Sequence, residues 1–171
     1  MNTIWLSFVL LLVPAFPGAS HPQAAHTLRL ETGRPFDAAL PRDFYLQGNA
    51  IPTEKRNAAL VITPSGKQLL FALLDTSGYS SQIQQKYIGM IIAEGRASVG
   101  TASLKVGSYG FGLTTKEDKT YFNIYDQAGT KMASCLMKND AQLKVPRPLQ
   151  VVLARDGTAR LYIGREWVQI R

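Results

Sequence analysis

The chain has 171 residues, which is long enough for one domain that buries its own hydrophobic core. Hydrophobic residues make up 46% of it and charged residues 18%, a composition that excludes an intrinsically disordered protein. The 19 Lys and Arg residues exceed the 12 Asp and Glu residues, so the protein is basic, with a formal net charge of +7. Basic surfaces attract anionic partners, although these cations are spread singly along the chain.

Residues 1–20 have the features of a secretion signal. An apolar run at residues 4–16 matches a signal-peptide core and is too short to span a bilayer. Gly18 and Ser20 supply the small residues for cleavage after Ser20, with a cut near Ala25 as the alternative. The first three residues contain no Lys or Arg, which departs from the usual pattern. We expect a secreted or periplasmic bacterial protein with no transmembrane segment in its mature form.

Residues 21–42 are predicted to form an irregular N-terminal arm, because prolines interrupt them and no sustained period is present. Within this arm, residues 27–30 are the one segment that fits an edge strand. Both histidines of the chain, His21 and His26, also fall in the arm.

From residue 43 to the C-terminus, short apolar runs alternate with turn residues. We expect about nine or ten strands and a single all-β domain over residues 43–171. The predicted fold class is an antiparallel β-sandwich, with a closed β-barrel as the alternative. Residues 80–86 form either a loop or one short helix. The predicted strands are residues 43–47, 57–63, 67–74, 88–92, 108–113, 120–126, 131–137, 149–155, 159–163 and 167–170.

Residues 87–113 are predicted to supply the centre of the sheet. Residues 88–92 are apolar or small on both faces, which is typical of a strand covered on both sides. In the next strand Gly110 and Gly112 share one face, so another backbone, a ring or a ligand approaches closely there. Close packing is the favoured cause. The charged turn at residues 116–119 leaves the register with the next strand open, either centred on Glu117 or slipped by one residue.

The pair Asp156-Gly157 is the sharpest hairpin signal in the chain. It predicts a two-residue primed turn in which both residues have a positive φ.

Three segments carry a resemblance to exported bacterial proteins of unknown function. They are DFYLQGNAIPTEKRNAAL at residues 43–60, YSSQIQQKYIGM at residues 79–90 and ARLYIGREWVQI at residues 159–170. The resemblance implies export but no activity and no catalytic residue. Separately, ASVGTASLKVGSYGFGL at residues 97–113 resembles a strand, turn and strand of periplasmic β-sandwich domains, which implies the fold alone.

The residues do not indicate a catalytic, metal or cofactor site. Two histidines in an irregular arm and one cysteine do not form a catalytic or metal-binding set. The segment GSYGFG at residues 107–112 lacks the Lys-Ser/Thr ending and the helix of a phosphate-binding loop. Cys135 alternates with Ala133 and Met137 on a face typical of a core, so we expect a buried, reduced thiol. We therefore expect no cofactor and favour binding over catalysis, with a carboxylate-based enzyme as the least favoured reading.

A polar and aromatic set is the candidate ligand site. Tyrosine rings and amide side chains suit a glycan or an amphipathic small molecule, because they combine apolar area with orienting hydrogen bonds. The simpler explanation is that tyrosines are good strand formers. The set consists of Asp75, Tyr79, Gln82, Gln85, Lys86, Tyr109, Tyr121, Asn123 and Tyr125.

The alternative function is structural. Residues 131–171 contain eight basic and three acidic residues, a net charge of +5. This basic C-terminal quarter predicts contact with an anionic envelope polymer, and we expect no specific binding of nucleic acid.

Overall fold

The structure is a computed structural model that describes residues 27–171. The predicted signal peptide, its cleavage site and both histidines therefore lie outside the described residues. No helix in the described part is long and apolar enough to cross a membrane.

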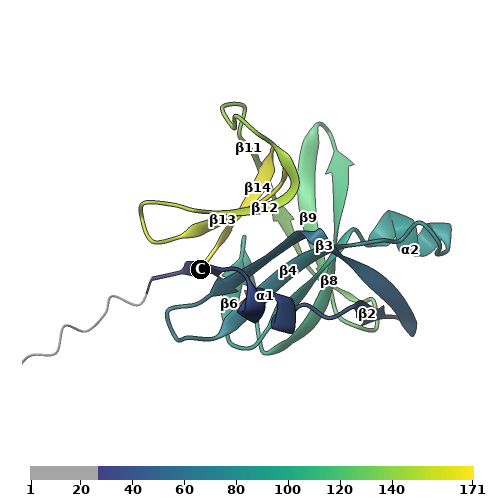
Figure 1. The fold of residues 1–171 in the computed structure, drawn as a ribbon. Helices are drawn as coiled ribbons and strands as arrows, with labels where there is room; N and C mark the ends of the chain where they lie inside the picture. Colours follow the sequence, from purple (N-terminus) through teal and green to yellow (C-terminus); the bar gives the residue numbers. More distant parts are fainter. Residues whose placement is uncertain (1–26) are drawn as a thin grey trace, which may run out of the picture.

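Two antiparallel sheets pack as a β-sandwich, as the sequence predicts, and neither sheet closes into a barrel. In Figure 1 the second sheet, coloured from olive to yellow over much of its extent, lies across one end of the first. The first sheet contains β1 (Arg29–Glu31), β2 (Asp43–Leu46), β3 (Asn49–Ile62), β4 (Gln68–Leu74), β5 (Gly89–Ala93), β8 (Gly107–Lys116), β9 (Lys119–Tyr125) and β10 (Lys131–Leu136).

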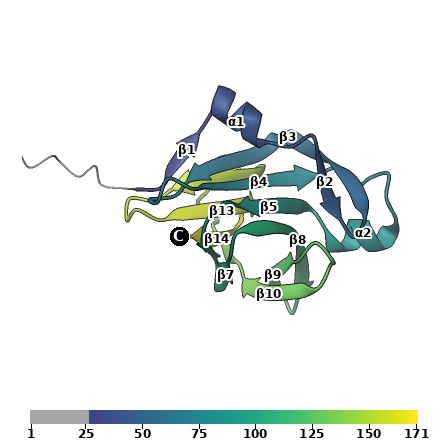
Figure 2. The same cartoon turned by 90° about the horizontal axis from the view of Figure 1, so that it is seen from below.

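The second sheet is smaller, and two short helices accompany the strands. Figure 2 shows α1 beside β1 and β3, with α2 at the far end of the fold from β13. The strands are β6 (Ala97–Val99), β7 (Ala102–Leu104), β11 (Lys138–Asn139), β12 (Arg147–Leu153), β13 (Ala159–Gly164) and β14 (Glu166–Ile170), and the helices are α1 (Arg34–Ala39) and α2 (Ser81–Lys86).

The N-terminal arm is more regular than the sequence indicates. Residues 27–42 contain β1, which overlaps the predicted edge strand at residues 29 and 30, and α1, which has Pro35 in its first turn. Proline is favoured there because it lacks the N–H that a helix start leaves unpaired. The predicted short helix at residues 80–86 is confirmed as α2, and the hydroxyl of Ser80 caps its N-terminus by accepting the Ile83 N–H.

Strand β5 is buried on both faces, which confirms the interpretation of residues 88–92. On one face Ile91 belongs to the main core between the two sheets. On the other face Met90 belongs to a second core that β2, β3 and α2 help to enclose. Both side chains are fully buried.

The glycines of this region are explained by close packing. A Cβ atom at Gly110 would lie 2.8 Å from the ring of Tyr87, which covers this position. A Cβ atom at Gly112 would lie well inside 3.0 Å of the backbone carbonyl oxygen of Lys86, at the end of α2. The bare face of β8 therefore lets α2 and the ring that follows it rest directly on the sheet.

The turn between β8 and β9 decides the register that the sequence leaves open. Glu117 and Asp118 have φ values of 49° and 60°, so they form a tight primed turn. The register is therefore the slipped one, with Tyr125 opposite Gly110, but Tyr121 pairs with Thr114 and does not cover a glycine.

At the C-terminal hairpin, the predicted two-residue primed turn is wrong, although the hairpin itself is confirmed. Gly157 has a positive φ of 78°, whereas Asp156 does not have a positive φ. The N–H of Ala154 donates to the carbonyl of Thr158 at 2.7 Å, which closes a three-residue loop over residues 155–157. Only the last loop position requires the left-handed region, and glycine occupies it.

Candidate functional site

The fold assembles part of the predicted ligand site. Four of its nine residues line one open hollow beside α2, which we call the α2 hollow. Its volume is about 390 Å³. The lining residues are Ser81, Gln82, Gln85, Lys86 and Tyr125.

The ammonium of Lys86 is already engaged within the α2 hollow. It donates a hydrogen bond to the carbonyl of Gly129 and lies 5.1 Å from the ring centroid of Tyr125 and 5.3 Å from that of Tyr87. Burial raises the pKa of Tyr125 above the ordinary value of a phenol. These contacts join α2 to the turn between β9 and β10. A ligand entering the hollow would have to compete with them.

Three predicted site residues lie away from the hollow. Tyr109 faces the core between the sheets, on the opposite face of β8, and its hydroxyl donates to the carbonyl of Lys105 at 3.0 Å. The hydroxyl of Tyr79 donates to a backbone carbonyl of β3. Asp75 accepts hydrogen bonds from the hydroxyl and the backbone N–H of Ser77, which lower the pKa of this exposed carboxyl. These three residues have local structural roles.

Asn123 and Tyr121 lie on the same face of β9 as Tyr125. Asn123 is fully buried; its amide nitrogen donates to the hydroxyl of Thr114 at 3.0 Å, and its side-chain oxygen has no partner among the described residues. The buried hydroxyl of Tyr87 also lacks a partner among residues 27–171. Burial is the main cause that raises the pKa of Tyr87.

The basic residues of the C-terminal quarter are used at separate places. Arg165 donates to the backbone carbonyls of residues 140, 141 and 143. Arg160 and Lys138 lie over the ring of Trp167, at 4.3 Å and 5.2 Å from its centroid. Arg147 lies elsewhere, at the cleft described next. The predicted contact with an anionic polymer would rest on these separate cations.

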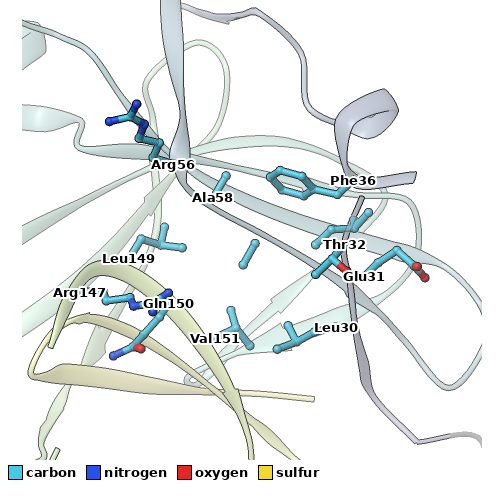
Figure 3. A pocket seen from close by; sticks show the side chains of 12 residues that line it. Leu30, Glu31, Thr32, Phe36, Arg56, Ala58, Arg147, Leu149, Gln150 and Val151 are labelled. Carbon is cyan, nitrogen blue, oxygen red and sulfur yellow. The ribbon is translucent and has the colours of Figure 1, made fainter. Parts of the chain in front are cut away.

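A second concavity, which the sequence does not indicate, lies where β3 and β12 approach each other from different sheets. We call it the edge cleft. Its volume is about 260 Å³, and Figure 3 shows the side chains around it. It is lined by Leu30, Glu31, Thr32, Phe36, Arg56, Ala58, Ala59, Leu60, Arg147, Leu149, Gln150 and Val151.

The edge cleft exists because the chain leaves the sheet early. After Glu31 the backbone turns at Gly33, which has a φ of 69°, and enters α1. Strand β1 therefore covers only the last three residues of β3, from Leu60 to Ile62. Phe36 of α1 forms one wall beyond that point, and β12 forms the opposite wall.

Apolar walls and an uneven charge distribution characterise the edge cleft. Leu149 and Val151 of β12 belong to the main core and also line the cleft, so the β12 wall is apolar there. In Figure 3 Arg56 and Arg147 lie on the side of the cleft opposite Glu31, and the guanidinium of Arg56 extends outward from its rim. Glu31 is paired with Arg29 at 2.6 Å, whereas Arg56 and Arg147 form no ion pair within residues 27–171. The cleft therefore combines apolar surface with two guanidinium groups that have no carboxylate partner in this part of the chain.

The described residues include one cysteine and no cluster of metal ligands. No group of three His, Cys, Asp or Glu side chains in residues 27–171 is placed to hold one metal ion. Cys135 is buried, as predicted, and contacts the turn between β6 and β7. Its sulfur atom accepts a hydrogen bond from the hydroxyl of Thr101 at 3.3 Å. This thiol packs between the sheets.

Comparisons with protein-family models, with curated proteins and with solved structures find no match to this chain.

Proposed function

We propose that this protein is a non-catalytic binding module whose ligand is amphipathic, carries a negative charge and occupies the edge cleft. The single observation that carries the proposal is the pairing of an apolar wall with Arg56 and Arg147 on one side. Ligand sites are mostly apolar with a few polar groups that fix orientation, and this cleft has that composition.

The α2 hollow supports the proposal less well. Its one cation, Lys86, is bonded to a carbonyl and stacked against two rings, so it has little remaining capacity for a ligand. The guanidinium groups of the edge cleft have no such internal partners among the described residues. A guanidinium binds a carboxylate through two parallel hydrogen bonds, which makes it the better anion receptor.

The test is a binding measurement with a carboxylate probe and its neutral counterpart. We expect octanoate to raise the melting temperature of the protein and octanol to raise it less, because only octanoate pairs with the guanidinium groups. A double variant, Arg56→Gln with Arg147→Gln, is expected to lose the difference between the two probes.

A matched control keeps the net charge of that variant. Arg96 and Arg171 are exposed and lie outside the edge cleft, so Arg96→Gln with Arg171→Gln removes the same charge elsewhere. A second variant, Ala59→Leu, fills the cleft from β3 and is expected to weaken both probes. Equal octanoate binding by the wild type and by both cleft variants would overturn the proposal.

A further inference from the structure

The edge cleft lies between two strand edges whose backbone groups are unpaired. Within the described residues β12 is the last strand of the second sheet and pairs only with β13. The Ala154 N–H donates a hydrogen bond to the Thr158 carbonyl. In an antiparallel pair every second residue bonds to the neighbouring strand, so this bond determines which residues of β12 bond to β13 and which do not. Residues 150 and 152 therefore hydrogen-bond to β13, and Val151 and Leu153 direct their N–H and C=O groups away from it, toward the free edge of the sheet.

On the other side of the cleft, the edge of β3 also has unpaired backbone groups, at Ala58. The Thr63 N–H bonds the Lys67 carbonyl at 2.8 Å, so Ile62, Leu60 and Ala58 direct their backbone groups away from β4. Strand β1 pairs with the first two of these. Ala58 has no strand partner on that side in the described structure, because the chain has already turned into α1.

From these edges we propose that the ligand of the edge cleft is an extended acidic segment of another protein, added as a strand to β12. This inference rests on the proposed function, since it identifies the ligand class of the same site. Strand addition uses main-chain hydrogen bonds for affinity and side-chain pockets for specificity. The outward groups of Val151 and Leu153 provide the hydrogen bonds, and the cleft provides a pocket.

Charge and size both favour a peptide. Arg56 and Arg147 complement an acidic side chain, and no charged residue follows Arg147 within β12. Sites that enclose small molecules typically hold about 300–1,000 Å³. The edge cleft, at about 260 Å³, lies below that range and suits one or two side chains of a longer ligand.

The other long free edge differs from β12 in where its pairing is interrupted. Strand β10 pairs only with β9 in the described structure, and a bulge between Lys131 and Ala133 interrupts it. Bulges and lysines are the devices by which proteins protect sheet edges from unwanted pairing. Strand β12 has its irregularity before Gln150, and its last four residues pair regularly with β13. Val152 and Leu153 in that regular part are 40% and 41% exposed.

The experiment uses ¹⁵N-labelled protein and a blocked hexapeptide of alternating glutamate and valine. We expect titration to shift the backbone amide signals of Val151 and Leu153 and to slow their hydrogen exchange. A second peptide carries N-methyl groups on the backbone nitrogens that would bond β12. Each methyl group is expected to weaken binding about fivefold, because one hydrogen bond is lost while the side chains stay the same.

Two variants at one position isolate the backbone of β12. Leu153→Pro removes an N–H that bonds nothing within the sheet, and proline is tolerated at such an edge position. Leu153→Ala shortens the side chain but keeps the N–H. We expect the proline variant to bind the peptide several-fold more weakly than the alanine variant, with both remaining folded by circular dichroism.

The outcomes separate this inference from the proposed function. If octanoate binding depends on Arg56 and Arg147 but the methylated and unmethylated peptides bind equally, strand addition is wrong and the cleft remains a small-molecule site. If neither probe responds to the two arginines, the proposed function itself fails. If the amides of Val151 and Leu153 shift with protein concentration alone, the occupant is a second copy of this chain, which overturns the peptide assignment.

Discussion

The close contact between β8 and α2 predicts that adding a single methyl group at Gly112 destabilises the fold strongly. In Gly112→Ala the added Cβ would lie well inside 3.0 Å of the Lys86 carbonyl oxygen. The obstacle is backbone at the end of a helix, so it cannot move aside by changing a rotamer. Overpacking of a core costs about 1–3 kcal/mol. We place this variant at the upper end, about 3 kcal/mol, because α2 must shift from the sheet.

That cost converts to a measurable change in melting temperature. Unfolding entropy is about 2.1 cal/mol/K per residue, so a domain of this size loses about 10 °C for 3 kcal/mol. The assay is urea unfolding followed by tryptophan fluorescence, with thermal unfolding as a second measure. Gly78→Ala is the matched control, because nothing lies within 4 Å of a Cβ atom at Gly78.

The control variant Gly78→Ala is expected to be more stable than the wild type. Alanine restricts the unfolded chain more than glycine does, which stabilises the protein by about 0.4–1 kcal/mol where the native backbone accepts it. If Gly112→Ala were as stable as the wild type, the contact of α2 with β8 would not be the reason for glycine at this position.

Three further predictions concern other parts of the chain. Tyr87→Phe should raise the free energy of unfolding by about 1–2 kcal/mol, measured in urea at pH 7, because it removes a buried hydroxyl that has no partner in the described structure. Burial raises the folded-state pKa of Tyr87, so ionisation of this phenol leaves the stability of the wild type unchanged below about pH 10 and lowers it as the pH rises from there through the folded pKa. The Tyr87→Phe variant has no such group and should lose less stability over that range. Replacing Glu117 and Asp118 by Asn-Gly should raise the melting temperature, since both residues now hold a positive φ, at a cost of about 1 kcal/mol or more each. If the N-terminal segment is a secretion signal, N-terminal sequencing of exported protein should begin at His21.

The sequence identifies strands best where burial imposes a simple pattern. Residues 88–92 are apolar on both faces, and the structure places them between two cores. Residues 49–56 are harder to identify as a strand, because five of the eight are polar or charged and Pro52 interrupts the run. They nevertheless form the first half of β3, where Pro52 pairs with Asp43 at an edge. Proline is accepted in a strand when its missing N–H is not needed by a neighbour.

The candidate ligand site shows why a site is harder to predict than a fold. The sequence groups Tyr109 with Tyr125, but a one-residue change in hairpin register decides which face each ring occupies. The tight turn at Glu117 and Asp118 sets Tyr125 opposite Gly110, so Tyr109 belongs to the core on the other face. The sequence predicts part of the α2 hollow correctly, because Gln82, Gln85 and Lys86 lie on one short helix and therefore stay together in the fold.

The edge cleft cannot be predicted from local sequence patterns for a different reason. Its walls come from β3 and β12, which lie about ninety residues apart and approach each other without hydrogen-bond pairing. The only sequence signal was Arg147 between Pro146 and Pro148, which indicates an extended segment but not its neighbour. Arg56 gave no signal, because an exposed arginine in a polar run is ordinary surface.

The way the fold uses its surfaces explains why recognition falls at an edge. One face of the first sheet is covered by the second sheet, and much of the other face is covered by β2, α2 and the rings of Tyr87 and Tyr125. Lys86, the one cation of the α2 hollow, serves that packing. The edge cleft differs, because its guanidinium groups and the outward backbone groups of β12 satisfy nothing else in the described chain. A segment that supplies both a carboxylate and an extended backbone would complete the hydrogen bonding that the two sheets leave open there.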